Sequence, residues 1–149
     1  MCSSDLETIR DNPPIVIDVG HTPEGVRLAR EGFYDGQRVH RAEPGFIVQF
    51  GDPQTRQLDA RESWGRGSAA GSGRPIGVVE LSRRRTHRRG AVGIAHRGVP
   101  AQGDSQMYIT LDERHDLDGK YVVFGQVVEG GAIPAALGVG DDIIKVSVR

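Results

Sequence analysis

Cysteine, aromatic residues and long apolar runs are all scarce in this sequence of 149 residues. The single cysteine, Cys2, excludes a disulfide within the chain and a zinc site built from cysteines. No stretch approaches the roughly 20 apolar residues of a membrane-spanning helix, so we expect no membrane partner. The first residues lack the basic and apolar regions of a signal peptide. This predicts a cytoplasmic protein, or a secreted or periplasmic one if a leader has been lost.

An excess of one charge sign is also absent, since 19 basic and 20 acidic residues give a net charge of −1. The chain as a whole is therefore not expected to bind nucleic acid. Residues 56–97 nevertheless carry ten arginines and three acidic residues, including the basic run Arg83–Arg89. That run could contact RNA or an acidic partner. A solvated loop is the favoured interpretation, because no aromatic residues are interleaved for base stacking.

Glycine, by contrast, is abundant, with 21 residues, and it disfavours a helical bundle because it weakens helix interiors. Short strand-like runs separated by turn residues predict a barrel or a sandwich. Thr22-Pro23-Glu24 indicates the start of one short helix. We expect a loose tail over residues 1–14, one domain over residues 15–149, and a long glycine-containing loop over residues 51–75. The predicted strands are residues 15–19, 46–50, 78–81, 91–95, 107–111, 121–124 and 143–148.

Neither a metal nor a cofactor is predicted. The five histidines are spread along the chain without the spacing of metal ligands. Residues 65–70 satisfy the dinucleotide-binding pattern G-x-G-x-x-A literally, but no strand precedes them and no helix follows them.

Three strings in one order are the most specific signal. The first is FYDGQRVHRAEPGFIVQFGDP (residues 33–53), the second DSQMYI (residues 104–109), and the third LDGKYVVFGQVVEG (residues 117–130). Together they resemble the cyclophilin-type peptidyl-prolyl cis/trans isomerases, and residues 64–80 resemble the loop of compact bacterial members. The resemblance implies a closed antiparallel eight-stranded β-barrel capped by one or two short helices. We expect a monomer that acts on proline-containing polypeptides, or alternatively a module that binds them without turnover.

The implied reaction is rotation about an X–Pro amide, whose barrier of about 18–20 kcal/mol reflects the loss of amide resonance. A catalyst must favour the twisted amide, in which the proline nitrogen becomes a hydrogen-bond acceptor. A permanently charged donor beside that nitrogen stabilises the twisted state more than either planar state. Arg41 matches the family's catalytic arginine. Gln49 would bond both Arg41 and the substrate backbone, because an unpaired amide among apolar neighbours is costly.

The remaining site residues follow from the same resemblance. They are the proline socket (Phe46, Ile47, Tyr108 and Leu117), the socket wall Tyr121, the substrate-bonding amide Gln106, and the backbone of Ala95 and His96, which would pair with an extended peptide. Two departures matter. Phe50 replaces a glycine of the family just after Gln49 and could crowd the strand or narrow the cleft. Asp116 stands where cyclosporin-sensitive members carry tryptophan, which predicts weak cyclosporin binding.

Overall fold

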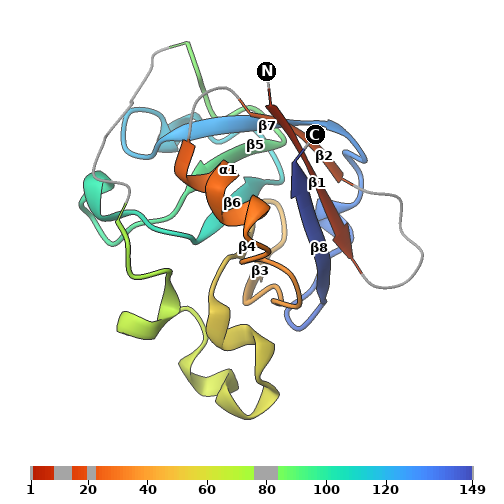
Figure 1. Ribbon diagram of the computed structural model, residues 1–149. Helices are drawn as coiled ribbons and strands as arrows, with labels where there is room; N and C mark the ends of the chain where they lie inside the picture. The colour runs from red at the N-terminus through yellow and green to blue at the C-terminus, as the bar shows by residue number, and fades with distance from the viewer. Residues whose placement is uncertain (1, 9–14, 20–22, 76–83, 149) are drawn as a thin grey trace.

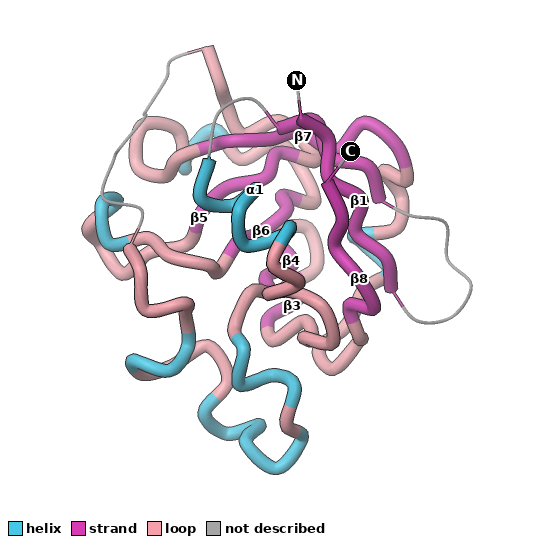
Figure 2. The backbone as a smooth tube through the Cα atoms, in the orientation of Figure 1, coloured by secondary structure: helices cyan, strands magenta, loops and turns pink. Residues whose placement is uncertain are grey.

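Antiparallel strands dominate the computed structural model, which describes residues 2–8, 15–19, 23–75 and 84–148 (Figures 1 and 2). The strands are β1 (Cys2–Thr8), β2 (Ile15–Val19), β3 (Arg41–Glu43), β4 (Ile47–Phe50), β5 (Ala91–Ile94), β6 (Met107–Thr110), β7 (Val123–Glu129) and β8 (Ile143–Val148). The helices are α1 (Pro23–Arg30) and the 3-10 turns η1 (Pro53–Arg56), η2 (Leu58–Ser63), η3 (Ser68–Ala70), η4 (Pro100–Gln102), η5 (His115–Leu117) and η6 (Pro134–Ala136). None of the helices in these ranges is long and apolar enough to cross a membrane.

The described strands form one sheet in the order β3-β4-β6-β5-β7-β2-β1-β8, and every pairing within it is antiparallel. The mainly β architecture is therefore confirmed, whereas closure into a barrel is only partly supported. The two outer strands, β3 and β8, are not paired with each other. Instead, the segment before β3 meets the start of β8 through one bridge, Arg38 to Asp142, and through backbone hydrogen bonds.

The prediction of a loose N-terminal tail is wrong for residues 2–8. These residues form β1, which pairs with β2 on one side and with β8 on the other. The sequence CSSDLET has no alternating apolar pattern, so composition gave no strand signal. A strand between two partners needs only its backbone groups for the ladder. Residues 9–14 and the strand predicted over 78–81 lie outside the described residues.

The core takes its residues from α1, from the segment that follows it, and from β2, β4, β5, β6, β7 and β8. Its largest fully buried side chains include Tyr34 and Phe50, each 1% exposed. Their rings meet edge to face, with centroids 6.1 Å apart. Because side chains alternate along a strand, Phe50 faces away from its neighbour Gln49. The expectation that Phe50 could narrow the cleft is therefore wrong, because its ring fills the core.

Candidate active site

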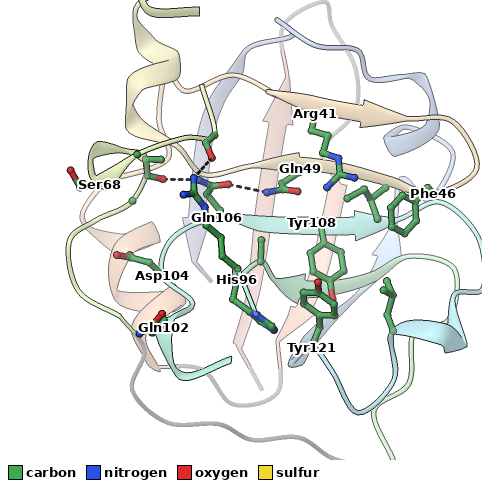
Figure 3. A pocket seen from close by; sticks show the side chains of 18 residues that line it. Arg41, Phe46, Gln49, Ser68, His96, Gln102, Asp104, Gln106, Tyr108 and Tyr121 are labelled. Atoms are coloured by element: carbon green, nitrogen blue, oxygen red, sulfur yellow. Dashed lines mark hydrogen bonds between the residues drawn. The ribbon is translucent and has the colours of Figure 1, made fainter. Parts of the chain in front are cut away.

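An open pocket of about 430 Å³ lies over β4 and β6 and is walled by loops on both sides (Figure 3). The structure brings together in this pocket all ten site residues that the sequence predicted: Arg41, Phe46, Ile47, Gln49, Ala95, His96, Gln106, Tyr108, Leu117 and Tyr121. They come from four separate parts of the chain.

Aromatic rings form the apolar half of the pocket. Tyr108 on β6 lies opposite Gln49 in the register of β4 and β6, and its side chain is buried. Tyr121 stands edge-on to the Tyr108 ring, with centroids 6.0 Å apart, and the His96 ring stacks on Tyr121 at 4.4 Å. Such edge-to-face and stacked pairs fix ring orientation. This half of the pocket is therefore a rigid apolar surface suited to a small ring.

Both ring nitrogens of His96 are used within the protein. Nε2 donates to the Lys120 carbonyl oxygen at 2.9 Å, and Nδ1 accepts from the Gly98 amide at 3.0 Å. The Ala95 amide likewise donates to the Gln106 carbonyl oxygen at 2.9 Å. The Ala95 amide is therefore used within the protein, while the pairing of the Ala95 and His96 backbone with a peptide stays a prediction. No described residue bonds the backbone N–H of His96, which remains open to a peptide.

Gln106 is the centre of a cluster of side-chain amides. Its Oε1 accepts from Nε2 of Gln49 at 2.9 Å and from Nε2 of His40 at 3.1 Å, while its own Nε2 donates to the Ala70 carbonyl oxygen at 2.9 Å. The prediction that Gln49 bonds Arg41 is wrong, because the amide of Gln49 turns to Gln106 instead. Sequence reasoning missed His40, whose only signal was its place beside Arg41 in the first family string.

The His40 side chain is held neutral by its surroundings. Burial lowers its pKa from 6.5, and Arg41 adds to the effect, while Asp52 and the bond to Gln106 oppose it. A neutral imidazole whose Nε2 donates to Gln106 must leave Nδ1 unprotonated. Among the described residues Nδ1 is a buried nitrogen without a hydrogen-bond partner.

Arg41 occupies the rim of the pocket beside Phe46 (Figure 3). Its register partner across β3 and β4 is Gln49. Two of its guanidinium nitrogens bond Glu43 Oε1, Nε at 3.2 Å and Nη2 at 3.0 Å. The guanidinium carbon lies 5.7 Å from the centroid of the Phe46 ring. No described residue bonds the third nitrogen, Nη1, so the guanidinium keeps a free donor.

Polar groups line the other half of the pocket, on the far side of Gln106, and sequence reasoning did not select them. They include Ser68, Gln102 and Asp104 (Figure 3). Asp104 holds the adjoining loop, because its carboxylate accepts from the Ser72 amide at 3.0 Å, from the Ser72 hydroxyl, and from the Gly73 amide at 3.0 Å. The described part of the long loop over residues 51–75 is thus a wall of the pocket.

Two glycines are required by close approaches next to the site. Gly51 has φ 111°, and a Cβ there would lie 2.2 Å from the Ser105 carbonyl oxygen. A Cβ at Gly93 would lie 2.2 Å from the hydroxyl oxygen of Tyr108. A larger residue would displace the backbone just before β6 at the first position and the Tyr108 ring at the second. Within the described ranges, no three His, Cys, Asp or Glu side chains gather as metal ligands.

Fold and site together define a mainly β protein with an arginine at the rim of an aromatic-lined pocket. Residues 21–141 match the family described as cyclophilin type peptidyl-prolyl cis-trans isomerase/CLD. The chain belongs to this family, as the sequence strings predicted.

Relatives with curated descriptions support the assignment. A peptidyl-prolyl isomerase of Cryptococcus neoformans is 37% identical over 123 residues, which cover 80% of this chain and 23% of that protein. A probable peptidyl-prolyl cis-trans isomerase of Brucella abortus is 36% identical over 110 residues, which cover 74% of this chain and 56% of that protein. This chain therefore spans only part of the length of the relatives it matches.

Solved structures show the same fold. A cyclophilin type isomerase of Cryptosporidium parvum, crystallised in the presence of the dipeptide Ala-Pro, superposes with a TM-score of 0.80 at 20% identity, covering 99% of this chain and 98% of that one. A cyclophilin from Hirschia baltica gives a TM-score of 0.66 at 19% identity, covering 97% and 72%.

Proposed function

We propose that this chain is a peptidyl-prolyl cis/trans isomerase that acts on proline-containing polypeptides without a cofactor. The observation that carries the proposal is the position of Arg41. Its guanidinium stands at the rim of the aromatic half of the pocket, and Nη1 is left free while Glu43 holds the other two nitrogens.

The mechanism follows from the shape of the pocket. The proline ring enters the apolar half between Phe46, Tyr108 and Tyr121, which keeps it fixed while the preceding carbonyl rotates. As resonance is lost, the proline nitrogen regains its lone pair, and Arg41 Nη1 donates to it. No covalent bond forms or breaks. Because the planar amide offers no such acceptor, the hydrogen bond favours the transition state selectively.

The amide cluster holds the backbone on either side of the proline. The described residues leave Gln49 Oε1 without a hydrogen bond, so it can accept from a peptide N–H. Gln106 has already used its oxygen twice and one of its two N–H groups once, which leaves one donor for a peptide carbonyl. Together with the backbone N–H of His96, these groups bind main-chain atoms of the peptide. They therefore discriminate little between peptide sequences.

One observation favours the alternative, a module that binds proline peptides without turnover. Glu43 neutralises part of the charge on Arg41 through the two hydrogen bonds to its guanidinium. Both side chains are nearly half exposed, 46% and 47%, and exposed pairs of this kind contribute only about 0–1 kcal/mol. A substrate that offers a developing lone pair can therefore compete, and the enzyme remains our proposal.

A protease-coupled assay on an Ala-Pro peptide tests this proposal. Wild type is expected to accelerate cis-to-trans conversion, and Arg41→Ala to lower kcat/KM by about 100-fold, the effect of losing one transition-state donor. Arg41→Lys should recover only part, since lysine lacks the planar fork. Arg30→Ala, at an exposed position of α1, is the matched control and should equal wild type. Absence of any acceleration by wild type would favour the binding module.

We further propose that the sheet closes into the barrel that the resemblance implies. Support comes from the hydrogen bonds of the Gly36 amide to the Ile143 carbonyl, 2.8 Å, and of the Ile143 amide to the Gln37 carbonyl, 2.7 Å. Slow hydrogen exchange at both amides, comparable with that of β5 and β6, is the expected result. Exchange as fast as in the exposed turns would contradict closure.

A further inference from the structure

Three polar side chains lie in line behind the aromatic half of the pocket. The Tyr108 hydroxyl is 2.6 Å from His87 Nε2, and His87 Nδ1 is 2.7 Å from Asp118 Oδ1. His87 is fully buried and Tyr108 is 3% exposed. The mechanism above uses only the ring face of Tyr108, so its hydroxyl and the other two groups have no assigned role.

Asp118 sets the direction of the hydrogen bond at one end of this row of side chains. Burial opposes ionisation of Asp118, but hydrogen bonds from the His87 side chain, the His87 amide and His115 outweigh it and lower the pKa of Asp118 to about 2. Asp118 is thus a carboxylate and can only accept. His87 Nδ1 donates to it, and in the neutral imidazole Nε2 accepts from the Tyr108 hydroxyl. Burial raises the pKa of Tyr108, which keeps that hydroxyl protonated.

Backbone hydrogen bonds at the same residues join the pocket floor to its wall. The His87 amide donates to Asp118 Oδ1 at 2.7 Å, and the Arg114 amide donates to the His87 carbonyl at 2.8 Å. Asp118 directly follows η5, whose last residue is Leu117. The Tyr121 amide donates to the Leu117 carbonyl at 3.3 Å. The row of hydrogen bonds from Tyr108 through His87 to Asp118 therefore links the pocket floor on β6 with the loop that carries Leu117 and Tyr121.

The neighbouring strand leaves the Tyr108 ring no space to shift. A Cβ at Gly93 on β5 would lie 2.2 Å from the Tyr108 hydroxyl oxygen and 2.3 Å from Cζ. The ring occupies that space up to the β5 backbone. A hydroxyl enclosed in this way loses its water partners, so it requires the acceptor that His87 supplies.

We propose that His87 and Asp118 are positioning residues, which hold Tyr108 at a fixed distance from Leu117 and Tyr121 so that the proline socket exists before the peptide arrives. This inference rests on the proposed function only in so far as the pocket binds proline. Neither residue touches the substrate. They raise the affinity for the proline ring, because a preformed socket does not have to be ordered at a cost in binding free energy when the peptide binds.

An NMR titration with an Ala-Pro peptide separates this effect from catalysis, because it gives the dissociation constant and the exchange rate at saturation in one experiment. His87→Leu and Tyr108→Phe should each weaken binding about 10-fold, and in His87→Leu the exchange rate of the bound peptide should stay within about threefold of wild type. The double variant should be no weaker than the worse single variant, since both changes interrupt the same chain. Arg88→Gln, at an exposed position next to His87 whose side chain bonds no described residue, is the matched control and should bind like wild type.

Two outcomes would overturn the proposal. The first is wild-type affinity in folded His87→Leu or Tyr108→Phe, with only thermal stability reduced. The second is a hydrogen on Nε2 of His87, measured by long-range ¹⁵N–¹H NMR on the wild-type protein, because the proposed arrangement has Nε2 accept from the Tyr108 hydroxyl. Asp118→Asn, which keeps an acceptor oxygen, provides a milder variant if His87→Leu fails to fold. It should weaken binding less than His87→Leu does. Failure of the proposed enzyme activity is distinguishable, because it would appear as absent exchange with binding intact.

Discussion

Replacing Gln106 with leucine tests whether the amide cluster holds the pocket together. The substitution keeps the approximate size of the side chain but removes its three hydrogen bonds, to Gln49, His40 and the Ala70 carbonyl. A hydrogen bond contributes about 0.5–1.5 kcal/mol net, and a buried group left without a partner costs about 1–3 kcal/mol. Because Gln49 and Ala70 are both buried, we expect the free energy of unfolding to fall by about 2–4 kcal/mol.

Urea unfolding of Gln106→Leu at equilibrium measures this loss, with stability extrapolated linearly to water. Gln102→Leu is the matched control, because Gln102 lines the same pocket, is exposed, and has a side-chain amide that bonds no described residue. It should lie within about 0.5 kcal/mol of wild type. The reasoning is refuted if Gln106→Leu is as stable as wild type, or if the two glutamine variants lose the same amount.

Three further predictions concern the core, pH and an inhibitor. Phe50→Ala should lower the free energy of unfolding by about 3–5 kcal/mol in urea, because its ring packs on Tyr34 in the core, and a loss below about 1 kcal/mol would contradict that packing. Burial lowers the pKa of His40 below 6.5, so the unfolded chain binds more protons, and stability should fall as the pH drops below 6.5. Urea midpoints at pH 7 and pH 5 should show a smaller drop in His40→Gln, and equal drops would exclude His40 as a cause. Cyclosporin should compete weakly with an Ala-Pro peptide, since Asp116 stands at the position of the tryptophan in sensitive members, and tight competition would contradict this.

The pocket residues could be predicted from the sequence because short strings of specific residue types carry them. Arg41, Phe46 and Gln49 lie within one string that spans β3 and β4, so their place near one another follows from a single hairpin. Gln106 and Tyr108 lie in the second string on β6, next to β4. Where the chain brings such residues together through local pairing, the sequence order already implies the site.

Hydrogen-bond partners could not be predicted in this way. Gln49 has Arg41 opposite it in the register of β3 and β4, yet its amide bonds Gln106, from a segment 57 positions away. The hydrogen-bond partner of a side-chain amide depends on the directions of the side chains across the sheet and on competing acceptors. Here Glu43 accepts the hydrogen bonds of Arg41. Sequence reasoning missed the polar half of the pocket for a related reason. Asp104 shapes this half by accepting hydrogen bonds from the loop at Ser72 and Gly73.

The strand β1 shows a different limit. A periodic apolar pattern reveals a strand that buries one face, and residues 2–8 have no such pattern. Their place is decided by the backbone groups that β2 and β8 offer on either side. The same reasoning explains Phe50, whose orientation toward the core follows from alternation once β4 is located.

The central claim is that Arg41 lowers the barrier to rotation in a pocket that binds proline. Exchange NMR on an Ala-Pro peptide at equilibrium tests it most directly, because one sample reports both binding and the rate of cis/trans exchange. We predict that wild type accelerates exchange, and that Arg41→Ala binds the peptide with similar affinity but loses about 100-fold of that acceleration. Equal exchange rates for wild type and Arg41→Ala at equal occupancy would contradict the account.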